Sequence, residues 1–233
     1  MVDQPEHSKQ VEDFLKAVYS LQGQTGRVST NALSETLMIT APSVTDMAQR
    51  LVTSGLVDYQ KYRGVLLTTA GEAIALKIIR RHRLIEAYLV TELGYELHEV
   101  HSEADRLEHA VSDRFIEAIA HKLDHPTVDP HGDPIPAADG ALPVRDLLPL
   151  TDLNERLGAR VAQIKTNDPD MIQHILERGF KLGSHVQVIA RDPFDGPITA
   201  LVDDEERVVG HNVAEFIFVE TDLVEADTDH HRN

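Results

Sequence analysis

The chain has 233 residues, with 22 basic and 39 acidic side chains, 13 histidines and a formal net charge of −17. It has no cysteine, which excludes disulfides, thiolate nucleophiles and cysteine-based zinc or iron–sulfur sites, so any metal must be held by nitrogen and oxygen. The first ten residues are polar and no apolar run is long enough to cross a membrane, so we expect a cytoplasmic protein without a membrane partner.

The first part of the chain predicts three short helices. Apolar residues recur at helical spacing over 11–21, and a cap at Ser29 predicts a second helix that ends at Leu37. Thr40 followed by Pro42 is a strong start signal for the third helix. Residues 1–75 carry 6 basic and 8 acidic side chains and are nearly neutral, although the whole chain is strongly acidic. This part of the chain can therefore still present a basic surface to DNA.

Two β-prone runs follow, at 56–59 and 65–68, on either side of a turn that ends at Gly64. Helices followed by a two-stranded hairpin are typical of a winged helix-turn-helix that binds DNA. The alternative at this stage is an unrelated small α+β domain.

The rest of the chain predicts a helical middle part and a β-rich end. Apolar periodicity predicts long helices over 69–93 and 97–123, and the Pro- and Gly-rich stretch 125–143 indicates a linker. Short β runs around a brief helix, 169–178, favour a small β-barrel; they lie at 159–164, 185–189, 198–202 and 216–219. The predicted fold is mainly α with small β elements. It divides into a winged-helix part, a helical part with its linker, a small β-barrel and a polar tail, at 1–73, 74–145, 146–222 and 223–233.

Histidines and carboxylates form stripes on the two long predicted helices. His82 and Glu86 are four residues apart and share a helix face. The next helix carries a second such stripe: His101, Asp105, Glu108 and His109. Such a stripe is costly to bury unless a bound cation supplies the opposite charge. A solvated face with ordinary charge pairs is the alternative for either stripe alone, and imidazole with carboxylate suits Mn²⁺, Fe²⁺, Zn²⁺ or Co²⁺.

These motifs resemble the diphtheria-toxin-repressor family of metal-dependent transcriptional regulators. The resemblance rests on His82-Arg83-Leu84-Ile85-Glu86, then on Val100-His101-Ser102-Glu103-Ala104-Asp105, and then on Glu108-His109 with Ser112-Asp113. It covers nearly the whole chain, from the winged helix to the SH3-like domain.

The resemblance implies two metal sites. The regulatory site would consist of Asp13, Asp105, Glu108 and His109. The second site would consist of His82, Glu86, His101 and Asp168. Met171 falls where iron-responsive members carry a glutamine ligand.

The resemblance also bears on the metal. Iron-type members carry methionine and cysteine where this chain has Asp13 and Asp105, and harder oxygen ligands fit Mn²⁺ better. We therefore expect a manganese-responsive regulator, with Fe²⁺ as the alternative metal. Lys16 stands where manganese regulators have a glutamate ligand, which favours two separated sites over a closely spaced pair.

The resemblance implies a homodimer that represses metal-uptake genes by binding a palindromic operator in double-stranded DNA. The recognition helix would begin with Thr40, Pro42, Ser43 and Thr45. Phosphate contacts would come from Arg27, Arg50, Lys61 and Arg63. Asp46 replaces a glutamine of iron-type members, so we expect a different base preference.

Without metal, repulsion among Asp13, Asp105 and Glu108 should hold the first helix away from the long helices. Metal then favours the DNA-binding arrangement by its differential affinity for the two states. Two other classes of protein fit the same residues: a binuclear metallohydrolase, and a metal store that also uses His125, His131, His230 and His231.

Overall fold

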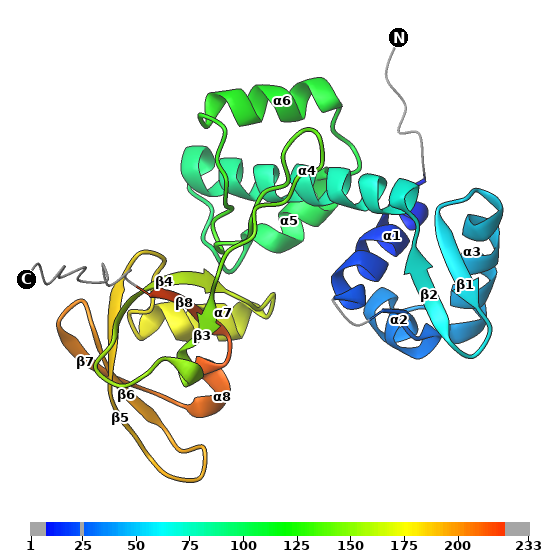
Figure 1. Ribbon diagram of the computed structural model, residues 1–233. Helices are drawn as coiled ribbons and strands as arrows, with labels where there is room; N and C mark the ends of the chain where they lie inside the picture. The colour runs from blue at the N-terminus through cyan, green and yellow to red at the C-terminus, as the bar shows by residue number, and fades with distance from the viewer. Residues whose placement is uncertain (1–7, 24–25, 222–233) are drawn as a thin grey trace, which may run out of the picture. The chain divides into compact units, whose positions relative to one another are not determined.

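The computed structural model describes residues 8–23 and 26–221, so the predicted polar tail and His230 and His231 lie outside the described residues. The described chain forms two compact units (Figure 1). The first unit runs to Tyr95 and includes Val100–Asp129 and Pro134–Pro143. The second unit comprises Glu96–Glu99, Pro130–Asp133 and the chain from Val144 onward. No helix in 8–23 or 26–221 has the length and apolar character needed to span a membrane.

The first unit begins with the expected helices and hairpin. Their bounds are α1 Lys9–Gln22, α2 Thr30–Leu37, α3 Ala41–Thr53, β1 Val57–Gln60 and β2 Gly64–Leu67. The Ser29 hydroxyl accepts the Ala32 N–H at the start of α2, and the Thr40 hydroxyl accepts the Ser43 N–H at the start of α3. Both caps satisfy helix N–H groups that would otherwise lack partners. Phe14, Leu15, Leu33 and Val44 are fully buried and hold the three helices together.

A 25-residue helix, α4 Thr69–Leu93, continues the first unit and ends at Gly94, as predicted. The prediction of one helix over 97–123 is wrong: α5 Val100–Leu107 and α6 Asp113–Lys122 are separate helices. The Ser112 hydroxyl accepts the Phe115 N–H and so starts α6 anew. The break leaves Glu108 and His109 in the turn that follows α5.

The second unit contains a six-stranded antiparallel sheet with the order β3-β8-β4-β5-β6-β7. Its strands are β3 Leu148–Pro149, β4 Gly158–Ile164, β5 His185–Arg191, β6 Ile198–Val202, β7 Glu205–Val209 and β8 Ile217–Thr221. Its helices are the short 3₁₀ helix η1 Leu150–Asp152, α7 Pro169–Glu177 and α8 His211–Ala214. Phe180 and the inner faces of the strands form its core.

The fold is therefore mixed α and β, with helical N-terminal parts and a C-terminal antiparallel sheet. The strand pairings of the described residues leave β3 and β7 as the two edges of the sheet.

The hairpin β1–β2 is fastened to the chain before α2. Val28 and Val65 exchange two backbone hydrogen bonds, of 2.7 and 2.8 Å between N and O. Gly64 lies beside this pairing at φ +101°, and a Cβ atom there would stand 2.1 Å from the Val28 carbonyl oxygen. Only glycine fits that backbone conformation and that close approach.

We predict that Gly64→Ala lowers the free energy of unfolding by about 2–4 kcal/mol, because backbone strain adds to the displacement of Val28. Gly55→Ala is the matched control: its φ is +71° and nothing lies within 4 Å of the added Cβ. The control should cost about 1–2 kcal/mol from strain alone. Urea unfolding measures both, and equal losses in the two variants would show that the close approach to Val28 has no energetic weight.

Candidate metal centre

Three chain segments of the first unit bring charged and imidazole side chains together. Helix α1 supplies Glu12, Asp13 and Lys16, and α4 supplies His82 and Glu86. Helix α5 and the turn after it supply His101, Asp105, Glu108 and His109. We call this set the seam. Glu12, His82, Glu86 and Glu108 are buried, whereas Asp13, His101 and Asp105 are partly exposed, so the seam extends from the interior of the folded unit to its surface.

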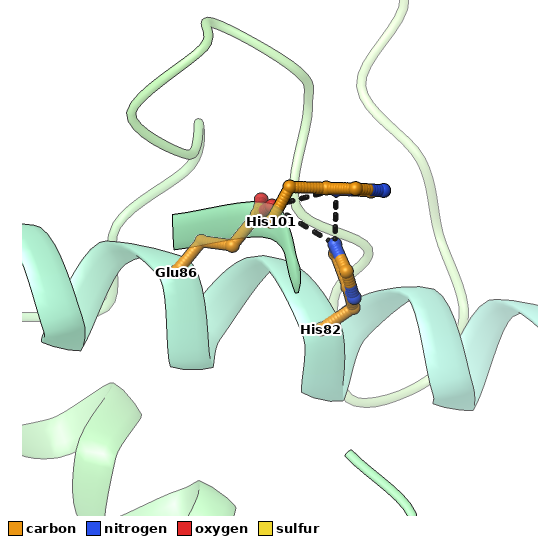
Figure 2. Close-up of side chains that lie close together, drawn as sticks. All are labelled: His82, Glu86 and His101. Carbon is orange, nitrogen blue, oxygen red and sulfur yellow. Dashed lines mark hydrogen bonds and ion pairs between the residues drawn. The ribbon is translucent and has the colours of Figure 1, made fainter. Parts of the chain in front are cut away.

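One group of the seam is the His82–Glu86–His101 triad (Figure 2). His82 Nε2 lies 2.9 Å from Glu86 Oε1 and 3.0 Å from His101 Nδ1. His101 Nδ1 lies 3.1 Å from the same Glu86 oxygen. Two nitrogens and one carboxylate oxygen thus face one another, as the donors of a metal site do.

A second group is the Asp13–Glu108–His109 triad. His109 Nε2 lies 2.8 Å from Asp13 Oδ1 and 3.2 Å from Glu108 Oε1. These are ion-pair distances, yet His109 Nε2 is buried and forms no well-aligned hydrogen bond with either oxygen. A buried nitrogen without a hydrogen bond is costly. The residues therefore fit a divalent cation, which would be bound by all three side chains at once.

Glu12 orients His109 from the other side of the ring. Glu12 Oε2 lies 2.6 Å from His109 Nδ1, and the Arg81 guanidinium lies 3.9 Å from the other Glu12 oxygen. When His109 donates its Nδ1–H to Glu12, the Nε2 lone pair is directed at the triad, which is how carboxylates prepare histidines for metal. Sequence reasoning missed Glu12, although a carboxylate three residues before Leu15 on the apolar face of α1 was a usable signal.

Lys16 lies between the two triads. Its Nζ donates to Asp105 Oδ1 at 3.0 Å and to both Glu108 oxygens at 2.9 and 3.0 Å, and it lies 3.1 Å from His82 Nδ1. The resemblance implied one site of Asp13, Asp105, Glu108 and His109. The structure brings Asp13, Glu108 and His109 together, whereas Asp105 groups with His82 and Glu108 around the Lys16 ammonium.

The opposite charges of the seam stabilise one another and shift the pKa values of its acidic and imidazole groups. Burial disfavours the charged Glu108, but the close approach of His109, His82 and Lys16 outweighs burial and holds the Glu108 pKa far below its usual range. Burial also opposes the charged imidazoles, but carboxylate partners raise the pKa of His82 to about 9 and that of His109 to about 11. These shifts favour the protonated rings over the neutral ones. A metal ion that they bind displaces these protons, so its affinity rises with pH.

Asp168 and Met171 belong to the second unit. Asp168 caps α7 by accepting the backbone N–H groups of Asp170 and Met171. Its role as a metal ligand stays a prediction. The Met171 side chain packs against the core of the second unit.

Most of the residues predicted to contact DNA lie on α3, at its N-cap or in the β1–β2 turn. Thr40 is exposed at the N-cap of α3, and Pro42, Ser43 and Arg50 are exposed within the helix. Lys61 and Arg63 are exposed in the turn. Thr45 is half-buried and its hydroxyl donates to the Ala41 carbonyl at 3.1 Å. Arg27 differs, because its guanidinium pairs with the Asp58 carboxylate and donates to the Asp58 carbonyl at 2.8 Å. Arg27 therefore buttresses the hairpin, and its contact with phosphate stays a prediction.

Comparison with known proteins agrees with this architecture. Residues 6–65 match "Iron dependent repressor, N-terminal DNA binding domain", residues 68–137 match "Iron dependent repressor, metal binding and dimerisation domain", and residues 148–221 match "FeoA domain". The diphtheria toxin repressor of Corynebacterium efficiens is 30% identical over 215 residues, which cover 85% of this chain and 93% of that protein. The chain belongs to the diphtheria-toxin-repressor family.

Some members of the family are named for iron and others for manganese. The iron-dependent repressor IdeR of Mycobacterium leprae is 29% identical over 90% of this chain and 96% of its own. A manganese-dependent transcriptional repressor in complex with manganese superimposes with a TM-score of 0.83, at 39% identity over 91% of this chain and 99% of that one. The regulator ScaR with bound Cd²⁺ gives a TM-score of 0.76 at 32% identity, over 90% and 98% of the two chains.

Family membership defines the broad function. This chain is a metal-dependent, DNA-binding transcriptional repressor with a dimerisation domain, in a family of repressors and not of enzymes. The alternative of a binuclear metallohydrolase is thereby set aside.

We predict that Glu12→Gln weakens metal binding at the His109 triad by about 10–100-fold, because the amide no longer fixes the imidazole with a negative charge. Glu35→Gln on α2 is the matched control, since Glu35 is exposed. Calorimetric titration with Mn²⁺ measures the affinity. If Glu12→Gln binds as tightly as the control, Glu12 does not position His109.

Proposed function

We propose that this protein is a Mn²⁺-dependent repressor of metal-uptake genes, with Fe²⁺ as the alternative effector. The observation that carries the proposal is the Asp13–Glu108–His109 triad, which joins α1 of the DNA-binding part to the turn after α5 with no sulfur ligand. The ligands proposed for the ion are Asp13, Asp105, Glu108 and His109 for the regulatory site, and His82, Glu86, His101 and Asp168 for the second site.

The bound ion would supply positive charge between α1 and α5. Asp13 is the group that gives the triad its regulatory effect, because it is carried by the helix that packs against α2 and β2. When Asp13 is held beside Glu108 and His109, α1 has one orientation relative to α4, and the attached recognition helix has one orientation too. The protein would have two states that differ in this orientation. Metal would shift the equilibrium toward the state with the intact triad, and the size of the shift would equal the difference in metal-binding free energy between the two states.

Manganese is favoured over iron by the chemistry of the donors. Seven of the eight proposed ligands lie in the described triads or next to Lys16 and offer only carboxylate oxygen or imidazole nitrogen. Oxygen-rich sites suit Mn²⁺, whereas sulfur ligands favour softer ions. The similarity to manganese-dependent repressors at 39% and 36% identity supports the same choice.

The proposed DNA partner is a palindromic operator that a homodimer binds with two winged helices. The exposed hydroxyls of Thr40 and Ser43 at the start of α3 suit contacts in the major groove, and Lys61 and Arg63 suit contacts with phosphate. We also propose that residues 1–73, 74–145 and 146–222 form the three domains, and that the C-terminal one is an SH3-like barrel.

The test is a mobility shift on a palindromic operator with and without Mn²⁺. Glu108→Ala or His109→Ala should lower the metal-stimulated affinity for DNA by about 100-fold or more, since each removes a ligand from the triad. Circular dichroism and gel filtration verify that each variant keeps the fold and the dimer, because Glu108→Ala also removes a partner of Lys16 and His82.

Glu103→Ala on α5 is the matched control, because Glu103 pairs with Arg106 at the surface, 3.4 Å away. A parallel anaerobic titration with Fe²⁺ distinguishes the two metals. Metal-stimulated DNA binding that survives in both Glu108→Ala and His109→Ala would contradict the proposal.

A further inference from the structure

We propose that the Lys16 ammonium is a built-in cation that fills a third metal position of the seam and limits the seam to two separated metal ions. This inference rests on the proposed function, because it concerns the same seam. It assigns to Lys16 a role in metal stoichiometry and in the docking of α1.

The geometry shows that a third group of metal-ligand type exists. One ligand atom each from His82, Asp105 and Glu108 lies within 4.8 Å of the other two, as in the two triads. Unlike those triads, this group has a cation at its centre, since Lys16 Nζ contacts all three side chains at 2.9–3.1 Å.

Steric exclusion follows from these contacts. A transition metal needs its oxygen and nitrogen donors at about 2.0–2.2 Å. An ammonium nitrogen within about 3 Å of every donor leaves no room for such an ion. Metal can enter this position only if Lys16 leaves it.

The burial of Glu108 stabilises Lys16 in this position. The Glu108 side chain is 1% exposed and that of Lys16 is 21% exposed. Removing one partner from a buried ion pair leaves an uncompensated charge, which is strongly destabilising. Lys16 is also three residues after Asp13, on one face of α1, so the same helix face supplies an anion to one triad and a cation to the gap beside it.

Lys16 and Asp13 would therefore attach α1 to the rest of the seam in two different ways. Lys16 ties α1 to Glu108 and Asp105 whatever the metal supply. Asp13 already lies 2.8 Å from His109 Nε2, and a bound metal would strengthen this second link by binding both side chains. The Lys16 ammonium would thus partly cancel the repulsion expected among Asp13, Asp105 and Glu108. A bound metal would then have less repulsion to overcome.

The experiment compares the full-length protein with Lys16→Glu, Lys16→Ala and the control Lys9→Ala, in which the exposed Lys9 of α1 is changed. Bound Mn²⁺ per chain is measured by mass spectrometry after equilibrium dialysis, and Mn²⁺–Mn²⁺ exchange coupling is measured by electron paramagnetic resonance. Mobility shift on operator DNA is followed in parallel.

We expect the parent chain and Lys9→Ala to bind at most two Mn²⁺ per chain without exchange coupling. Lys16→Glu should bind one more Mn²⁺ per chain and show coupling, because Glu108 then bridges neighbouring ions. Lys16→Ala should also gain one Mn²⁺, more weakly, which covers the case that Lys16→Glu fails to fold.

The two proposals fail in different ways. A parent chain that responds to Mn²⁺, with unchanged stoichiometry in both folded Lys16 variants or with a coupled pair already present, overturns the role of Lys16 alone. A parent chain whose DNA binding ignores Mn²⁺ overturns the proposed function, and the role of Lys16 with it.

Discussion

The burial of Glu108 is the constraint on which the seam depends. A carboxylate that is almost fully removed from water must be surrounded by positive charge and hydrogen-bond donors. Lys16, His82 and His109 supply them from α1, α4 and the turn after α5. Groups from three segments must therefore remain together for Glu108 to stay buried.

This constraint links the DNA-binding part of the chain to its metal chemistry. Helix α1 packs against α2 and β2 on one side and against α4 on the other, and its Asp13 and Lys16 reach into the seam. A change of charge in the seam therefore acts on the helix that carries the recognition unit. Glu12 extends the same link, because it joins His109 to Arg81, whose other nitrogen donates to Asp113 at 2.7 Å.

Much of the architecture could be predicted from the sequence, since local signals determine it. The caps at Ser29 and Thr40 and the helical spacing up to Gly94 defined α2, α3 and α4. The break at Ser112 was missed because apolar spacing continues across it. Strand β7 was missed because it is an edge strand with a polar sequence, joined to β6 by Asp203 and Asp204, which both have positive φ.

The seam was predictable only in part. Spacing placed His82 beside Glu86 and predicted the second stripe, but it could not show which side chains from different segments would meet. Lys16 stood out only as a departure from the family, and its contacts with Asp105 and Glu108 depend on how α1 packs against α4. A charge that neutralises a site from another helix leaves no periodic signal in the sequence.

Anomalous diffraction from a crystal grown with Mn²⁺ tests the account most directly, because it locates each ion among these side chains. We predict a peak within the His82–Glu86–His101 triad, another within the Asp13–Glu108–His109 triad, and Lys16 Nζ between them. A manganese peak bounded by His82, Asp105 and Glu108, with Lys16 turned away or Asp13 bound to nothing, would contradict it.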